Sequence, residues 1–168
     1  MSNVLTANPQ VSEICQSVQN SYAELQQIIA DQLTKLPSAK LYQPPAPDEW
    51  SAMQILAHMT EIMPYWGSQI EKLVAQPGQN FGRVMSDPDR VRYIQEHGHD
   101  TLAATQAALP PAYARLQHVL GQLKDTDLAL TGVHSRFGER PLEWFVTEFV
   151  TDHLKNHLTQ LRECLTAI

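Results

Sequence analysis

Cysteine and long apolar runs are scarce in this chain of 168 residues. Its two cysteines, Cys15 and Cys164, are too few and too far apart for a disulfide framework or a Cys-x2-Cys zinc site. No window approaches the roughly 18 apolar residues that a membrane-spanning helix needs, and the N-terminus lacks the basic and apolar regions of a signal peptide. We therefore expect a cytoplasmic protein that does not bind membranes.

Positive charge is also limited. Twelve lysine and arginine residues stand against eighteen aspartate and glutamate residues, which gives a formal net charge of -6. No basic run is present that could neutralise a row of phosphates, so nucleic acid is not an expected partner. The length suits one hydrophobic core rather than two, and we expect residues 1–168 to form a single domain.

Apolar residues recur at steps of three and four along four segments, which is typical of helices buried on one face. The first segment covers 11–36 and ends before Pro37. The second begins near Trp50, with Asp48 as its candidate N-cap, and ends at Gln76. Residues 77–100 are predicted to form a loop with one short helix over 88–96, and strand-like alternation is absent.

The third segment, 102–123, keeps its register across Pro110 and Pro111, which favours one kinked helix. A proline inside a helix costs about 3 kcal/mol, so two shorter helices are the alternative. After a turn-rich connector, the last helix begins at Pro141 and ends near Leu165.

Four such helices can bury their apolar stripes against one another, which predicts an all-α fold, an antiparallel up-down-up-down four-helix bundle. In that arrangement the second and fourth helices run in the same direction. Cys15 and Cys164 then lie at the same end of the bundle. A disulfide between them is one outcome, and two reduced, buried thiols are favoured in a cytoplasmic protein.

Histidines are the candidate metal ligands. His153 and His157 are four residues apart, so their rings stack on one face of the last helix, at positions of its apolar stripe. His58 points inward from the second helix, between Ile55 and Ile62. A buried imidazole needs partners for its two ring nitrogens, and metal ligation is one way to provide them.

The expected depths of these histidines agree if their helices start at the same end. At about 1.5 Å per residue, His58 lies about 12 Å from Trp50, while His153 and His157 lie about 18 and 24 Å from Pro141. These levels overlap within the error of predicted helix ends. Three imidazoles can then share one ion and leave positions open for water or substrate. The alternative is that they only hydrogen-bond across the core.

Two further residues are candidates for chemistry. Glu61, three residues after His58, is the candidate catalytic residue, as a fourth ligand, an outer partner of a ligand or a general base; a solvated surface glutamate is the alternative. His134, in the last connector, is the candidate cofactor-binding residue, and the alternative is that it orders the loop. Arg136 and Arg140 fit either a carboxylate of a substrate or surface ion pairs.

Three motifs occur together: WSAMQILAH at the start of the second helix, the connector GVHSRFGERPLEW, and a final helix with His-x3-His that continues into HLTQL. As a set they resemble the DinB/YfiT-like superfamily of metalloenzymes, over about Ser12 to Cys164. The resemblance implies an antiparallel four-helix bundle, frequent homodimers, and a divalent ion such as zinc or nickel held by His58, His153 and His157. Some relatives are thiol-dependent S-transferases and isomerases, which implies a low-molecular-weight thiol and a small-molecule substrate as partners.

Two functions follow as hypotheses. The first is a divalent-metal-dependent enzyme in which the open position of a three-histidine site activates a thiol or water, as in a thiol-dependent S-transferase or a related hydrolase. The second is a non-catalytic helical module for metal binding, dimerisation or stress response, in which the same histidines are structural.

Overall fold

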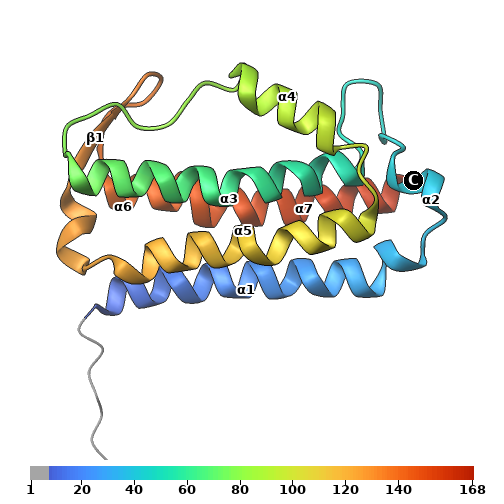
Figure 1. Cartoon of the computed structure of the whole chain (residues 1–168), viewed down its shortest axis with the longest axis horizontal. Coiled ribbons are helices and arrows are strands. Elements are labelled where there is room, and N and C mark those ends of the chain that lie inside the picture. The colour runs from blue at the N-terminus through green and yellow to red at the C-terminus, as the bar shows by residue number, and fades with distance from the viewer. Residues whose placement is uncertain (1–7) are drawn as a thin grey trace, which may run out of the picture.

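Four long helices pack side by side around one apolar core in the computed structural model, which describes residues 8–168. Figure 1 shows them: α1 (Pro9–Asp31), α3 (Ala52–Ala75), α5 (Leu102–Gln122) and α7 (Asp152–Ala167). Each buries one apolar stripe, as the sequence periodicity predicts. The all-α four-helix bundle is therefore confirmed. Within the described residues, no helix combines the length and the apolar character that crossing a bilayer requires.

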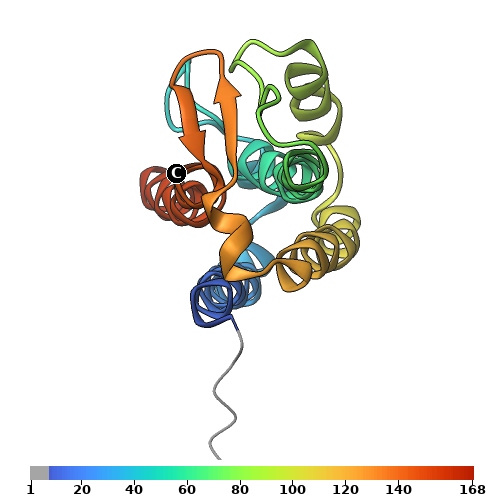
Figure 2. The ribbon, with the colours of Figure 1, turned by 90° about the vertical axis from the view of Figure 1, so that its left-hand side faces the viewer.

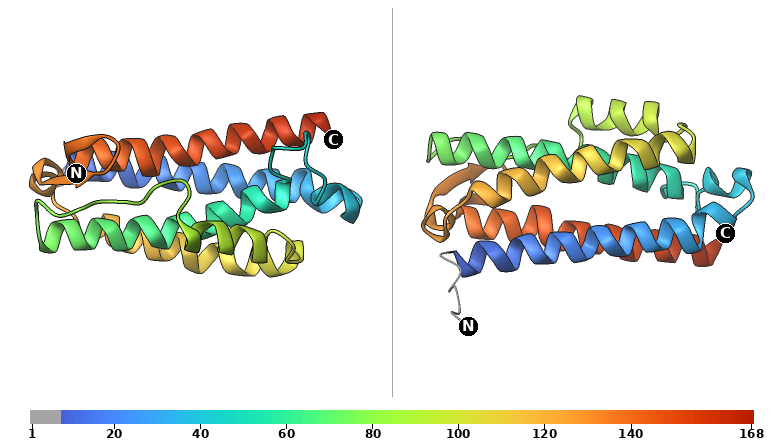
Figure 3. Two further views of the ribbon diagram at one scale, coloured as in Figure 1. Left: turned by 90° about the horizontal axis from the view of Figure 1, so that it is seen from above. Right: turned by 60° about the horizontal axis from the view of Figure 1, so that its bottom comes forward.

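The directions of the helices differ from the prediction. Helices α1 and α7 run one way and α3 and α5 run the other, so the order is up-down-down-up (Figures 1 and 3). The Cys164 thiol lies 3.7 Å from the Trp50 carbonyl oxygen, while His58 lies beside His153, so α3 and α7 are antiparallel. The predicted up-down-up-down order, with these two helices running in the same direction, is wrong.

The segment between α3 and α5 causes this difference. It carries the helix α4 (Pro88–His97) back along the outside of α3, above the bundle in Figure 1. The Tyr42 hydroxyl donates to the Asp100 carbonyl at 2.8 Å, so the chain has returned to the end where α3 begins. Because 77–97 spans the length of the bundle instead of turning at one end, α5 starts beside the start of α3. The short helix predicted over 88–96 is confirmed.

Helix starts and proline positions also differ in detail from the sequence pattern. Helix α3 is capped by Ser51, whose hydroxyl accepts from the backbone N–H of Gln54 in a reciprocal capping box, and Asp48 is not the cap. Helix α5 continues through Pro110 and Pro111, so one helix rather than two is observed. Both prolines are exposed, as are the residues four positions earlier, whose carbonyls lose their helical partner and can bond water instead.

The last connector is more ordered than predicted. After a 3-10 turn at Asp125–Ala129, the strands β1 (Thr131–His134) and β2 (Gly138–Pro141) form an antiparallel hairpin. Gly138, at φ +69°, closes its turn. Strands of four residues are too short to show alternation, which explains why the sequence pattern did not predict them. Figure 2 shows the hairpin and the 77–97 segment on the same side of the bundle, above α3 and α7.

The last helix is continuous but irregular. It starts as α6 (Leu142–Val146), widens into a π-helical turn at Thr147–Thr151, and continues as α7. A π turn rotates everything after it around the helix axis. The helical face that carries His153 is therefore set by this turn.

The two cysteines lie at opposite ends of the bundle. Helices α1 and α7 run in the same direction, as Figure 1 shows, and Glu24 of α1 pairs with Arg162 of α7. Cys15 lies near the start of α1 and Cys164 near the end of α7, so the two thiols are far apart. Both thiols are free, and burial raises the pKa of each. The expectation that they share one end is wrong, and so is the disulfide alternative.

The capping box at the start of α3 yields a stability prediction. Ser51→Ala removes the hydroxyl that accepts from Gln54, so the free energy of unfolding should fall by about 1 kcal/mol in urea titrations. Asp48→Ala is the matched control, because Asp48 is exposed and caps nothing; its effect should stay within about 0.5 kcal/mol. Equal losses in the two variants would contradict the assignment of the cap.

Candidate metal centre and its cavity

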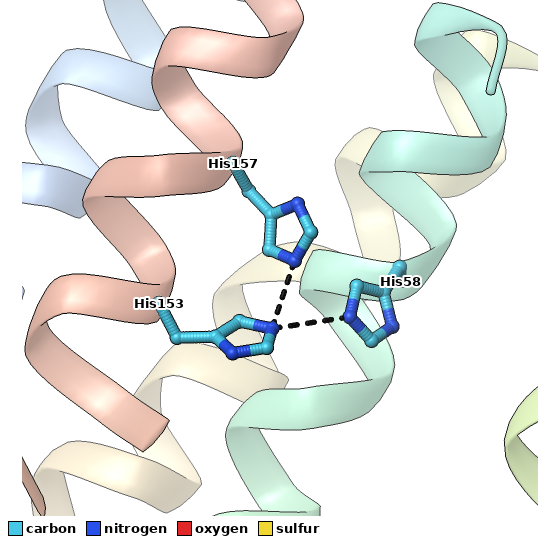
Figure 4. Close-up of side chains that lie close together, drawn as sticks. All are labelled: His58, His153 and His157. Atoms are coloured by element: carbon cyan, nitrogen blue, oxygen red, sulfur yellow. Dashed lines mark hydrogen bonds between the residues drawn. The ribbon is translucent and has the colours of Figure 1, made fainter. Parts of the chain in front are cut away.

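Three imidazole rings converge between α3 and α7 (Figure 4). The Nε2 atom of His153 lies 2.8 Å from Nε2 of His157 and 3.3 Å from Nε2 of His58. One ligand atom from each ring lies within 4.8 Å of the others. The expected convergence of the three rings is therefore present, although the helices that carry them run in opposite directions.

Hydrogen bonding alone does not satisfy these nitrogens. A ring nitrogen of a neutral imidazole either donates one proton or accepts through one lone pair. His153 Nε2 therefore forms a hydrogen bond with only one of its two neighbours, the Nε2 atoms of His58 and His157. The other Nε2 atom is left without a histidine partner. A divalent cation accepts all three lone pairs at once, and imidazole nitrogen is a ligand that suits zinc and nickel. The donor set fits a metal ion.

The outer nitrogen of His157 has a partner that fixes its ring, whereas the outer nitrogen of His58 has none in the described part of the chain. His157 Nδ1 lies 2.8 Å from the Gln160 side-chain oxygen, which only accepts, so Nδ1 carries the proton and the Nε2 lone pair faces the centre. His58 Nδ1 is buried and has no hydrogen-bond partner among the described residues. The Glu61 carboxylate is 3.8 Å from it, beyond hydrogen-bond length.

Burial keeps the three histidines neutral. Loss of solvation lowers the pKa of His153 to about 3 and lowers the pKa of His58 and His157 as well. The mutual repulsion of the rings and the positive charge of Arg90 add to this effect for His58 and His153; at His157 the Gln160 hydrogen bond opposes it. Neutral imidazole is the form that binds metal, so no proton needs to be displaced at neutral pH.

Glu61 is held in an ion pair rather than in solvent. Both of its oxygens lie 2.6 Å from Nη2 of Arg83, and the two side chains are only 11% and 10% exposed. The Arg83 guanidinium also lies 3.8 Å from the centre of the Tyr65 ring, and burial raises the pKa of that phenol to about 12. The solvated alternative for Glu61 is therefore wrong. The carboxylate faces Nδ1 of His58, not the Nε2 centre, which fits an outer partner of a ligand.

His134 both orders its connector and borders the cavity. It is 4% exposed, its Nδ1 accepts from the backbone N–H of Arg136 at 3.1 Å, and its ring lines the same cavity as the three histidines. Its Nε2 is buried without a hydrogen-bond partner. Burial and the charge of Arg136 lower its pKa, while a backbone contact with Arg83 raises it. Arg136 borders the cavity, whereas Arg140 lies over the Trp144 ring and does not.

A cavity of about 690 Å³ opens onto the three histidines, a size typical of small-molecule sites. It lies between α3 and α7, with the 48–50 and 134–137 segments at its edges and the 83–90 segment on its third side. Seven apolar side chains, four histidines, six charged side chains and one glutamine line it: Asp48, Glu49, Trp50, His58, Ile62, Trp66, Arg83, Val84, Met85, Arg90, His134, Arg136, Phe137, Glu148, Phe149, His153, His157 and Gln160.

The sequence reasoning did not place Arg83 and Arg90 at the cavity. It also did not predict that Trp50 packs against the histidines. Trp50 packs edge-on against the His58 ring, with centroids 5.0 Å apart, and stacks on the His157 ring at 6.0 Å. Asp87 caps α4, with Pro88 at its first position, and these signals place Arg90 in its first turn. They do not show which helix α4 lies against, so the arginines could not be assigned to the cavity.

The buried pair beside His58 gives a second stability prediction. Glu61→Ala leaves Arg83 with only the Asp87 carboxylate, 3.6 Å away, so the free energy of unfolding should fall by about 3 kcal/mol. The control is Glu71→Ala, which breaks the exposed pair of Glu71 with Arg115 and should cost less than about 1 kcal/mol. If denaturant titrations gave the two variants similar losses, Glu61 would not be acting as a buried partner.

Comparisons with known proteins agree with this fold. A family model described as the DinB superfamily matches residues 21–161. The solved structure of YfiT from Bacillus subtilis, described as a probable metal-dependent hydrolase with an unusual four-helix bundle topology, is 14% identical with a TM-score of 0.75, over 98% of this chain and 90% of that one.

Two other structures are also similar. One is TT2238, described as a four-helix bundle protein, at 17% identity and a TM-score of 0.65, over 92% of this chain and 99% of that one. The other is a mycothiol-dependent maleylpyruvate isomerase, at 10% identity and a TM-score of 0.61; the match covers 94% of this chain but only 60% of the isomerase. A search of curated proteins found no match.

Proposed function

The chain belongs to the DinB superfamily, and from that premise we propose that it is a divalent-metal-dependent enzyme acting on a small molecule. His58, His153 and His157 hold the ion through their Nε2 atoms. One observation carries this proposal: three neutral imidazoles, that of His58 buried and the other two partly buried, direct their Nε2 atoms at a common point where they cannot all be hydrogen-bonded to one another.

The surrounding residues have supporting roles in this proposal. Gln160 keeps the proton of His157 on Nδ1 and so directs its Nε2 lone pair inward. Glu61 is a positioning residue, because it is fixed by Arg83 and faces the outer nitrogen of His58. Trp50 packs against two of the rings and shields them from solvent. His134 borders the space in which a substrate or thiol binds.

A divalent ion at this position lowers the pKa of a thiol or water bound to it, so that the reactive anion forms near neutral pH. The apolar lining of the cavity holds an organic substrate beside the histidines and excludes bulk water. A low-molecular-weight thiol is the proposed co-substrate, and the mycothiol dependence of a structurally similar isomerase supports it. Transfer to the thiol and hydrolysis are the two reactions proposed.

Metal content of the purified protein tests the site. The wild type should carry about one zinc or nickel ion per chain by elemental analysis, and a His153→Ala, His157→Ala double variant should carry none. His118→Ala is the control, since His118 is exposed on α5 and faces no other imidazole; its metal content should equal that of the wild type. A wild type that stays free of ion after exposure to zinc and nickel, yet folds stably, would favour the non-catalytic module.

Metal binding should also stabilise the fold. An ion bound only by the folded chain stabilises it by about 4 kcal/mol at a free concentration 1,000 times its dissociation constant. Zinc should therefore raise the melting temperature of the wild type in a thermal shift assay, and a chelator should reverse the change. The double histidine variant should not respond to either.

Four other features stay predictions. They are the choice between zinc and nickel, a homodimer, a cytoplasmic location and the identity of the thiol. Turnover of a panel of thiols and electrophiles by the metal-loaded protein, together with the molecular mass in solution, addresses the enzymatic activity and the dimer.

A further inference from the structure

The arginines of this protein differ in burial and in partners. Arg92 and Arg162 are exposed and Arg115 is half-buried, and each pairs with a carboxylate. Arg136 and Arg140 are exposed and lie over aromatic rings. Arg90 is partly buried at the cavity, yet among the described residues no carboxylate lies within 4.0 Å of its guanidinium. A partly desolvated cation without an ion partner costs stability, whereas an exposed pair adds little. Folding stability alone therefore does not explain Arg90.

The contacts of Arg90 fix its position but leave donors free. Its Nη1 donates to the Met85 carbonyl at 2.7 Å, and its guanidinium lies 5.2 Å from the centre of the Trp50 ring. Trp50 in turn contacts the rings of His58 and His157. Because a guanidinium carries five N–H donors and only one donates to a described residue, the rest can bind an anion in the cavity.

The nearest acidic groups are already engaged. Glu61 contacts Arg83 with both oxygens, and Asp87 accepts from the backbone N–H of Arg90 while lying 3.6 Å from Arg83. Burial lowers the pKa of the Arg90 side chain. The charges of Glu61 and Asp87 oppose this shift but do not cancel it. Asp48, Glu49 and Glu148 also border the cavity, but all three are exposed to water.

We propose that Arg90 binds the carboxylate of the small molecule that occupies this cavity, so that the substrate class is an organic carboxylate with an apolar body. The apolar body lies against Ile62, Trp66 and Phe149, which line the cavity. Val84 and Met85, 51% and 74% exposed, border its mouth, and an apolar ligand would cover them. The substrate class rests on the proposed function. The binding of a carboxylate by Arg90 does not, and it is tested separately.

A pair of probes that differ only in charge tests the inference. The probes are 3-phenylpropionate and 3-phenylpropan-1-ol, and their dissociation constants are measured by calorimetry with metal-free and zinc-loaded protein. The wild type should bind the carboxylate at least about tenfold more tightly than the alcohol, because hydrogen bonds to charged groups are the strong ones. Arg90→Gln should abolish this preference, and Arg90→Lys, which keeps the charge but not the fork, should retain part of it.

Arg92→Gln is the matched control. It removes the same charge from the same helix, but its side chain is 65% exposed and does not border the cavity, so the tenfold preference should persist. Thermal unfolding of each variant establishes that it is folded. If Arg90→Gln does not fold, the preference for the carboxylate is compared between Arg90→Lys and Arg92→Gln, and it should be weaker in Arg90→Lys. Equal preferences in the Arg90 and Arg92 variants would overturn the inference.

Two sources of the carboxylate are separated by a second probe pair, 3-mercaptopropionate and 3-mercaptopropan-1-ol. An Arg90-dependent preference seen only with this pair assigns the carboxylate to the thiol; one seen with the phenyl pair assigns it to the substrate. Zinc content is measured in every variant. Arg90-dependent binding in a protein that takes up no zinc would contradict the proposed function and support the Arg90 site. Zinc binding without that preference would support the metal site and contradict the Arg90 site.

Discussion

The candidate site depends on one constraint, the convergence of three largely buried, neutral imidazoles whose Nε2 atoms cannot all be hydrogen-bonded to one another. Loss of solvation keeps the rings neutral, and neutrality leaves lone pairs that face a common point. The neighbouring side chains hold this arrangement from outside: Gln160 orients His157, and Trp50 packs on two of the rings. A divalent cation at their centre would accept all three Nε2 lone pairs at once.

The cavity beside this centre combines apolar side chains with three arginines and three carboxylates, in a chain of net charge -6. Arg83 is paired with Glu61. Arg90 has no ion pair within residues 8–168 and lies over the Trp50 ring, which in turn contacts the rings of His58 and His157. Both arginines come from the 77–97 segment, which crosses the outside of α3. That segment therefore both sets the direction of α5 and supplies the charged side of the cavity.

One step of the reasoning that brought the three histidines together was wrong, yet their rings converge in the structure. His58, His153 and His157 were brought together by matching their depths on helices assumed to be parallel, whereas α3 and α7 are antiparallel. The rings of the last helix still reach His58 because His153 and His157 lie near the middle of the 142–167 segment, where depth changes little when the direction is reversed. Cys15 and Cys164 lie near helix ends, where reversal matters most, and the prediction for them failed.

The sequence by itself determined the four helices, their buried faces and the identity of the inward histidines, because apolar periodicity and the i, i+4 spacing are properties of single helices. It also determined the start of α4, through Asp87 and Pro88. Only the tertiary structure decided the directions of the helices, the hairpin beside His134 and the approach of Arg90 to the cavity. These depend on contacts between segments far apart in the chain, and no local pattern shows which helix face the returning 77–97 segment packs against.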